Sequence, residues 1–107
     1  ELHSSTIYTW NINQILYVEA LAKRCQVVTE HGSTNLQYRF MNFEDQLTPH
    51  GFLKPHRSFL VNCKYISVIE KDAVLLDNGE RIPLSRNRVS EVKQQFMQYI
   101  NGGSHAI

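Results

Sequence analysis

Residues 66–84 read ISVIEKDAVLLDNGERIPL, and this stretch predicts three short strands joined by tight turns. The strand-forming residues gather in three runs: Ile66 to Glu70, Ala73 to Asp77 and Glu80 to Leu84. The Asn78-Gly79 dipeptide between the last two is a strong hairpin signal, because a type I′ turn needs positive φ at both central positions. The stretch therefore predicts an antiparallel β-meander.

Further strands are predicted upstream of the meander. Four runs are rich in β-branched and aromatic residues or alternate apolar with polar ones: Thr6 to Trp10, Ile15 to Glu19, Cys25 to Thr29 and Leu36 to Phe40. The last two predict a hairpin across a loop at His31 to Thr34. With Asn42 as N-cap and Gly51 as stop, the next segment predicts a helix of about two turns, shortened by Pro49.

The C-terminal segment predicts a longer helix. Its apolar residues recur at helical spacing, at Val89, Val92, Phe96 and Ile100. Ser85 suits the N-cap and Asn101-Gly102 suits the stop, so residues 101–107 are expected to fray. The whole pattern predicts a mainly β fold of antiparallel strands with short helices and a C-terminal helix.

Composition and length favour one folded domain over residues 1–107, with its core at about residues 6–100. Hydrophobic residues make up 42% and charged residues 20%, which excludes a disordered chain. There is no apolar run of the roughly 20 residues that span a membrane, and no signal peptide at Glu1 to Trp10. Two cysteines do not make a disulfide scaffold. A cytoplasmic protein is therefore expected, and the start at Glu1 instead of Met favours a piece of a longer chain.

Residues 52–62, FLKPHRSFLVN, form the least regular stretch. Phe59-Leu60-Val61 is interpreted as core, and Asn62 as a residue that hydrogen-bonds backbone at a turn and not a ligand. The aromatic residues on apolar faces are also interpreted as core and not as a platform for stacking bases; they are Trp10, Tyr17, Phe40, Phe43, Phe52, Phe59 and Phe96.

The net charge of +1 argues by itself against a nucleic-acid binder, which would show a basic excess. The charges are nevertheless segregated along the chain. Residues 20–29, 46–69 and 81–90 hold eight of the eleven Lys and Arg residues and no acid, whereas the rest holds three bases and all ten acids. A basic face is therefore possible on a nearly neutral protein.

Each basic segment has two interpretations. A run of charge is most simply a solvated surface. Arg86 and Arg88, however, fall in the first turn of the expected helix, where the macrodipole disfavours cations, and an anion bound there would explain them. His56 and Arg57 can likewise bind phosphate oxygens or a guanine edge, or can pair with a surface carboxylate.

Catalytic and metal sites are poorly supported. Cys25 with His56 as its base would resemble a thiol hydrolase, but nothing supplies a third member or an oxyanion hole. His50, His56 and Cys63 lack metal-ligand spacing, and no Gly-rich phosphate loop is present. We therefore expect no enzyme activity, no metal, no cofactor, no small-molecule substrate and no membrane association.

Three stretches together resemble the LytTR DNA-binding domain of bacterial response regulators. They are ILYVEA (15–20), FLKPHRSFLVN (52–62) and IPLSR (82–86), joined by the Asp77-Asn78-Gly79 hairpin. The middle stretch, of the form F-x-x-x-HRS-[FYV]-x-VN, is the most specific, and the resemblance covers about residues 6–100. It implies stacked antiparallel sheets with short helices instead of a helix-turn-helix.

The resemblance also implies a function and a set of contact residues. Loops from the sheets would enter successive major grooves on one side of bent double-stranded DNA, through Lys23, Arg24, Cys25, His56, Arg57, Arg86, Asn87 and Arg88. Family members often carry a polar residue where Cys25 stands, so Lys23 or Arg24 would supply that contact. A receiver domain would precede this domain in the longer protein, and two protomers would bind paired direct repeats. The alternative is a small β module that binds an acidic peptide or protein.

Overall fold

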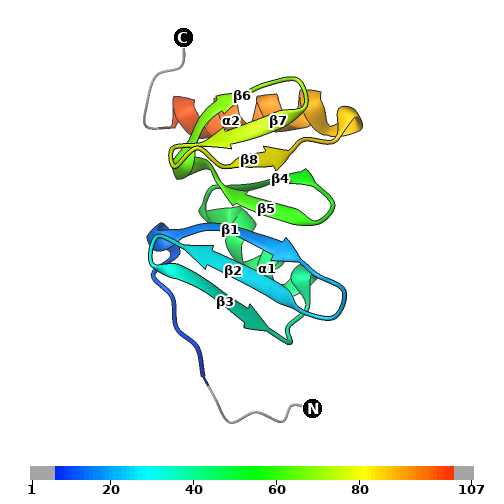
Figure 1. The fold of residues 1–107 in the computed structure, drawn as a ribbon. Coiled ribbons are helices and arrows are strands. Elements are labelled where there is room, and N and C mark those ends of the chain that lie inside the picture. The colour runs from blue at the N-terminus through cyan, green and yellow to red at the C-terminus, as the bar shows by residue number, and fades with distance from the viewer. Residues whose placement is uncertain (1–6, 103–107) are drawn as a thin grey trace.

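The computed structural model describes residues 7–102 and measures 47 × 27 × 24 Å along its principal axes. It contains eight strands in two antiparallel sheets (Figure 1). The strands are β1 (Ile15–Ala20), β2 (Cys25–Thr29), β3 (Gly32–Leu36), β4 (Phe52–His56), β5 (Phe59–Asn62), β6 (Ile66–Ile69), β7 (Ala73–Leu76) and β8 (Arg81–Pro83). The helices are α1 (Phe40–Leu47) and α2 (Val89–Asn101), with 3₁₀ turns η1 (Ile12–Gln14), η2 (Thr48–His50), η3 (Cys63–Tyr65) and η4 (Arg86–Arg88). The expected mainly β fold is confirmed.

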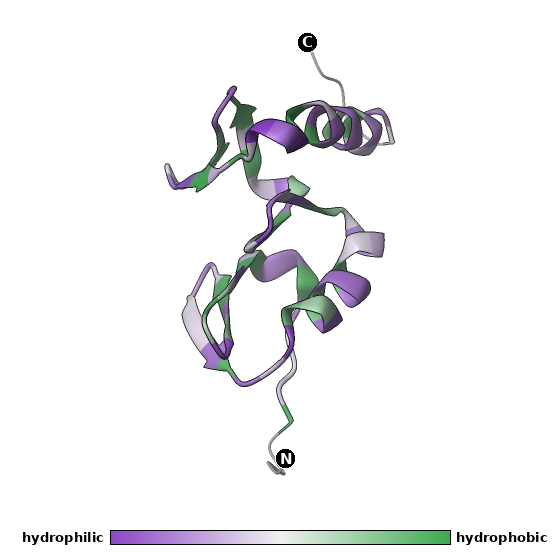
Figure 2. Ribbon diagram, turned by 90° about the vertical axis from the view of Figure 1, so that its right-hand side faces the viewer, coloured by the Kyte–Doolittle hydropathy of each residue, from purple (hydrophilic) through white to green (hydrophobic). Residues whose placement is uncertain are grey.

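The two sheets have the orders β3-β2-β1-β5-β4 and β6-β7-β8. Residues of the larger sheet alternate between two cores, as the two-residue period of a strand requires. Val18 and Leu60 pack beneath α1, whereas their neighbours Tyr17 and Val61 pack toward the smaller sheet and α2. Figure 2 shows α1 against the larger sheet and α2 against the smaller one. The two faces of one sheet thus join both halves of the domain.

The meander is confirmed as β6-β7-β8, but the expected type I′ turn is wrong. Gly79 has φ of 92°, whereas no described non-glycine residue has positive φ. The Gly79 N–H donates to Leu76 O at 2.9 Å, and Asn78 Oδ1 accepts from the Glu80 N–H at 3.0 Å. The Asn78 side chain thus stabilises a turn of negative φ, and Gly79 alone takes the left-handed conformation. This is the arrangement of a three-residue hairpin loop.

The expected strand at residues 6–10 is wrong where it can be compared. Thr6 lies outside the described residues, and residues 7–10 are not a strand. Ile7 is 87% exposed, and within the described residues the segment has β propensity but no neighbouring strand to pair with. Trp10 packs edge-on against Phe43, with ring centroids 6.4 Å apart.

The hairpin and helix boundaries between residues 25 and 51 also differ from expectation. β3 begins at Gly32, not Leu36, so the loop is the two-residue turn Glu30–His31; an edge strand tolerates the polar residues that suggested a loop. α1 begins at Phe40, within the expected strand, because Phe40 turns inward toward the core of α1. Its length and its stop are confirmed: α1 and η2 end at Gly51, whose φ is 86°.

Residues 52–62 are more regular than expected, since they form the β4-β5 hairpin around the turn Arg57–Ser58. The irregular pattern reflects a register shift between Leu53 and His56, where Pro55 lacks a backbone donor. Leu60 and Val61 are fully buried, as expected of core residues. Asn62 is buried and hydrogen-bonds backbone groups, which confirms its interpretation.

The C-terminal helix begins later than expected. Ser85 precedes η4, and α2 begins only at Val89 with Glu91 in its first turn. The arginines of η4 therefore precede α2 instead of lying in its first turn, and Arg88 is the N-cap residue at the positive end of the helix dipole. The expected stop is confirmed at Asn101, and residues 103–107 lie outside the described part of the chain.

Cys63 in η3 makes a pH-dependent contribution to stability that can be measured. Burial raises the pKa of its thiol from 9.0 to about 12. The unfolded chain then loses this proton at lower pH than the native state. The contribution of Cys63 to the free energy of unfolding is therefore fully present below pH 9 and is lost as pH rises toward 12. One such proton contributes about 1.4 kcal/mol per pH unit.

We expect urea unfolding between pH 8 and 11 to show this fall more steeply in the unsubstituted domain than in Cys63→Ala. The other groups that titrate in this range are common to both proteins, so the difference in slope isolates Cys63. Parallel curves for the two proteins would contradict the assignment.

Candidate nucleic-acid interface

Three basic segments come together on one side of the molecule. They are the β1-β2 loop (residues 21–24), the β4-β5 turn (residues 57–58) and η4 (residues 86–88), and they follow one another along the long axis at the right of Figure 1. We call these three segments the contact face. Their neighbourhood follows from the antiparallel pairing of β1 with β5, which places the end of β1 beside the start of β5.

Backbone hydrogen bonds hold the three segments to one another. The Ala20 N–H donates to Ser58 O at 2.8 Å, which ties the first loop to the β4-β5 turn. The Ser85 N–H donates to Pro55 O at 2.9 Å, which ties the start of η4 to β4. The sheets thereby position the loops rigidly, as binding loops on a scaffold require.

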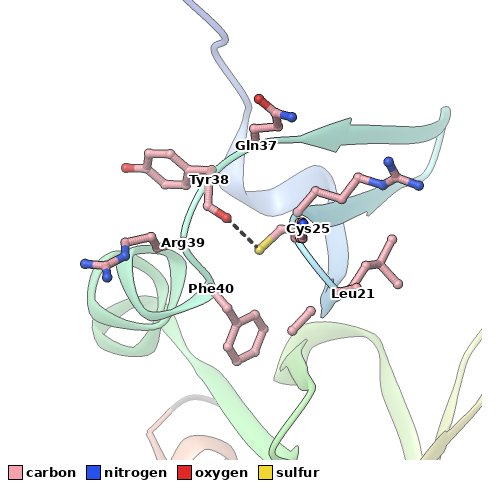
Figure 3. A pocket seen from close by; sticks show the side chains of 10 residues that line it. Leu21, Cys25, Gln37, Tyr38, Arg39 and Phe40 are labelled. Atoms are coloured by element: carbon pink, nitrogen blue, oxygen red, sulfur yellow. Dashed lines mark hydrogen bonds between the residues drawn. The ribbon is translucent and has the colours of Figure 1, made fainter. Parts of the chain in front are cut away.

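The first loop is a tight turn, closed by a 2.8 Å hydrogen bond from the Leu21 N–H to Arg24 O. Lys23 and Arg24 are exposed. Cys25 is only 1% exposed, and its Sγ donates to Tyr38 O at 3.1 Å (Figure 3). Burial also raises the pKa of this thiol, so it is neither a base contact nor an activated nucleophile. Cys25 is thus a core residue in this structure, and the exposed cations of the loop are Lys23 and Arg24.

Cys25→Ser tests whether Cys25 acts only as a core residue. Serine can keep the hydrogen bond to Tyr38 O, so we expect duplex binding to change by less than about twofold, because the contact face is unaltered. A duplex titration beside a thermal-unfolding control measures this. Loss of binding by a variant that remains folded would give Cys25 a functional role.

The β4-β5 turn presents Arg57 at its tip. Arg57 is exposed, whereas His56 is half-buried. The Ser58 N–H donates to His56 Nδ1 at 3.1 Å, and the imidazole packs edge-on against Phe59 at 5.8 Å between ring centroids. His56 therefore shapes the turn that carries Arg57, and its other ring nitrogen is left for a ligand.

The third segment, η4, exposes Arg86 and Asn87. Arg88 is half-buried and borders a hollow of about 80 Å³ with Lys54, Glu44 and Glu91. Its side chain thus lies partly toward the helices, and Arg86 is the better placed of the two arginines to meet a ligand.

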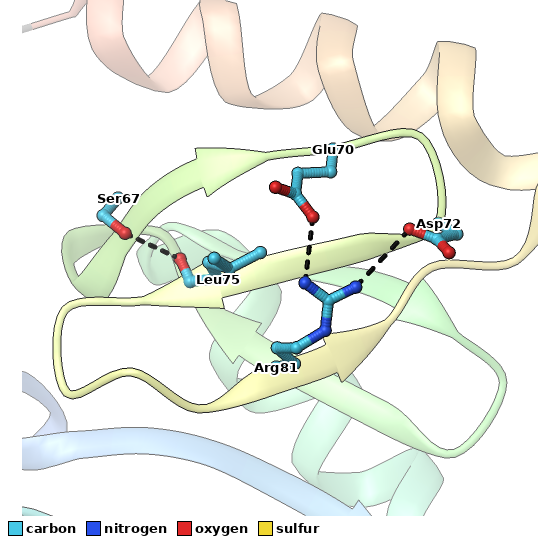
Figure 4. Close-up of polar contacts among 5 residues, drawn as sticks. All are labelled: Ser67, Glu70, Asp72, Leu75 and Arg81. Atoms are coloured by element: carbon cyan, nitrogen blue, oxygen red, sulfur yellow. Dashed lines mark hydrogen bonds and ion pairs between the residues drawn. The ribbon is translucent and has the colours of Figure 1, made fainter.

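The structure divides the eight cations of the acid-free segments into two groups. Lys54 pairs with Glu44 at 3.1 Å, and Arg81 pairs with Glu70 at 3.0 Å and Asp72 at 3.6 Å (Figure 4). Lys64 lies over the Tyr65 ring in η3 and donates to Asn13 O at 3.3 Å, away from the contact face. The remaining five belong to the contact face, and among residues 7–102 none of them forms an ion pair; they are Lys23, Arg24, Arg57, Arg86 and Arg88.

The opposite ends of the strands carry acidic groups. Glu30 lies in the β2-β3 turn, and Asp77 and Glu80 lie in the β7-β8 turn. Glu80 accepts a 2.8 Å hydrogen bond from the Tyr17 hydroxyl, and burial with this neighbouring charge raises the pKa of Tyr17. Acidic groups also lie at the other end, however: the β6-β7 turn carries Glu70 and Asp72, and the Leu84 N–H donates to Asp72 O beside the start of η4.

The alternative sites do not assemble. Cys63 is buried in η3, whereas His50 is exposed in η2 and His56 lies at the end of β4. Within residues 7–102 no group of three His, Cys, Asp or Glu side chains has the arrangement of a metal site. In the same part of the chain no helix is both long and apolar enough to cross a membrane.

Five cations on loops along one side of the sheets, with no ion pair among the described residues, are typical of a nucleic-acid-binding domain. The chain belongs to the LytTR DNA-binding domain family, whose model, described as LytTr DNA-binding domain, matches residues 5–97. That family is one of DNA-binding transcription regulators and not an enzyme class.

Two kinds of relative agree with the family. The transcriptional regulatory protein YpdB of Escherichia coli K12 is 35% identical over 78% of this chain and 36% of its own length, and YpdB of Shigella flexneri matches equally. The chain thus spans about a third of these curated relatives. The solved LytTr DNA-binding domain of a methyl-accepting/DNA response regulator from Bacillus cereus superposes with a TM-score of 0.72 at 31% identity, over 78% of this chain and 82% of that one.

Proposed function

We propose that this domain binds double-stranded DNA in a sequence-specific manner as the effector domain of a bacterial transcriptional response regulator in the cytoplasm. The contact face carries the proposal, because it aligns three basic segments along a molecule 47 Å long. One helical turn of B-DNA measures about 34 Å, so loops on this face can enter successive major grooves on one side of the duplex.

The contact side chains divide into two roles. Arg57 and Arg86 are the base readers, since a guanidinium fork can donate to both O6 and N7 of guanine. The other contact residues bind phosphates and fix the register; they are Lys23, Arg24, His56, Asn87 and Arg88. Two protomers on paired direct repeats would double the recognised length, and a receiver domain in the longer protein would control their assembly.

Titration with a promoter-length duplex and with a single strand, each at two salt concentrations, tests this function. Each neutralised phosphate contributes about −0.9 to the slope of log affinity against log salt. The three phosphate contacts that are Lys or Arg, namely Lys23, Arg24 and Arg88, therefore predict a slope of about −3 for duplex. One duplex should also be preferred over others. Indifference to duplex DNA at low salt would contradict the proposal and favour the acidic-partner module.

A further inference from the structure

Arg39 lies beside the contact face although it is far from the basic segments in sequence. A hollow of about 530 Å³ separates the β1-β2 loop from residues 37–40, which lead into α1 (Figure 3). Three cationic side chains border it: Lys23, Arg24 and Arg39. Among its described lining residues there is no carboxylate. The charge around this hollow therefore favours an anionic ligand.

The backbone that carries Arg39 is held in place by its neighbours. Tyr38 O accepts the Cys25 thiol, and the Tyr38 ring packs edge-on against Phe43 at 4.9 Å between centroids. The Gln46 side chain donates to the Tyr38 hydroxyl at 3.1 Å. These contacts fix the position of Arg39 relative to the first loop while its own side chain remains exposed.

Nothing in the described structure gives the Arg39 side chain a structural role. It makes no hydrogen bond to the backbone at the start of α1, and it pairs with no carboxylate among residues 7–102. In Figure 3 it extends away from Cys25. A long cationic side chain on a fixed backbone, with no ion pair among residues 7–102, is well suited to bind a phosphate of a ligand that spans the hollow.

We propose that Arg39 is a further DNA-contacting residue, which binds a backbone phosphate of its own, across the hollow from those bound by Lys23 and Arg24, at the border of the groove that residues 21–24 enter. This inference rests on the proposed function and extends the contact surface to the start of α1. Because a phosphate contact carries no sequence information, Arg39 should contribute equally to all duplexes.

The test compares Arg39→Ala, Arg39→Lys and the control Lys64→Ala, a cation in η3 away from the contact face. Arg39→Ala should weaken binding about five- to tenfold on preferred and random duplexes alike, and reduce the salt slope by about one. Arg39→Lys should restore most of the slope, and Lys64→Ala should match the unsubstituted domain. Thermal unfolding confirms that each variant is folded.

The outcomes separate the two proposals. If the unsubstituted domain binds duplex with a steep salt slope and Arg39→Ala keeps that slope, the Arg39 inference is overturned and the proposed function stands. If the unsubstituted domain does not bind duplex, the proposed function fails and the inference fails with it. Polyglutamate, titrated in parallel, is the probe for an acidic protein partner. If Arg39→Ala weakens polyglutamate binding and leaves duplex binding unchanged, the Arg39 inference is also overturned.

Discussion

Replacing Arg57 with alanine is expected to weaken binding to the preferred duplex by about 1–3 kcal/mol, or about 5- to 150-fold. Arg57 is exposed at the tip of the β4-β5 turn, and hydrogen bonds on both sides of Ser58 hold that turn. The backbone that carries Arg57 is thus already fixed, so little backbone order has to be acquired on binding. Arg86→Ala should give a loss of the same order.

The comparison of duplexes separates base reading from phosphate binding. Arg57→Ala should lose much more affinity for the preferred duplex than for random DNA. It should also tolerate base substitutions at one base pair of the preferred duplex that the unsubstituted domain rejects. Arg57→Lys keeps the charge but loses the fork, so it should recover affinity for random DNA better than specificity. Equal losses of affinity for the preferred and the random duplex would contradict the base-reading role of Arg57.

Asn62→Ala is expected to have the largest effect on folding, about 2–4 kcal/mol of unfolding free energy. Asn62 is 4% exposed, and its Nδ2 donates to Ile15 O at 2.9 Å and Ile12 O at 3.4 Å. Its Oδ1 accepts from the Lys64 N–H at 3.0 Å. Alanine would leave buried backbone groups without partners where β1, β5 and η3 meet.

Asn11→Ala is the matched control, because Asn11 Oδ1 also accepts a backbone N–H two residues on, from Asn13 at 2.9 Å, but at an exposed site. Its loss should be at most about 1 kcal/mol, since water replaces the bond. Urea denaturation measures both variants. An Asn62→Ala domain within about 0.5 kcal/mol of the unsubstituted one would show that this network does not stabilise the fold.

Local patterns predicted the fold best where packing agreed with propensity. The meander and the periodic residues of α2 satisfy both, so their strands and helix occur close to the expected positions. Residues 7–10 have strand-forming side chains but no neighbouring strand in the described part of the chain, and Gly32 to Thr34 look like a loop but pair along β2. Pairing partners are distant in sequence, and no local pattern specifies them.

The contact face could be predicted in part from charge. The acid-free segments marked the three loops, but only the structure shows that Lys54 and Arg81 are paired with carboxylates. The resemblance implied a contact by Cys25, which the structure buries, and no local pattern pointed to Arg39, because burial and proximity depend on the packing of α1 against β2. The roles of the individual loop residues on DNA remain predictions.

The most direct test maps backbone amide chemical shifts while a duplex two helical turns long is added. The account predicts that the largest changes occur on the contact face, at residues 21–24, 57–58 and 86–88. The acidic turns at the opposite ends of the strands, Glu30–His31 and Asp77–Glu80, should change little. Changes concentrated in those turns, or spread over α2 with the three loops unaffected, would contradict it.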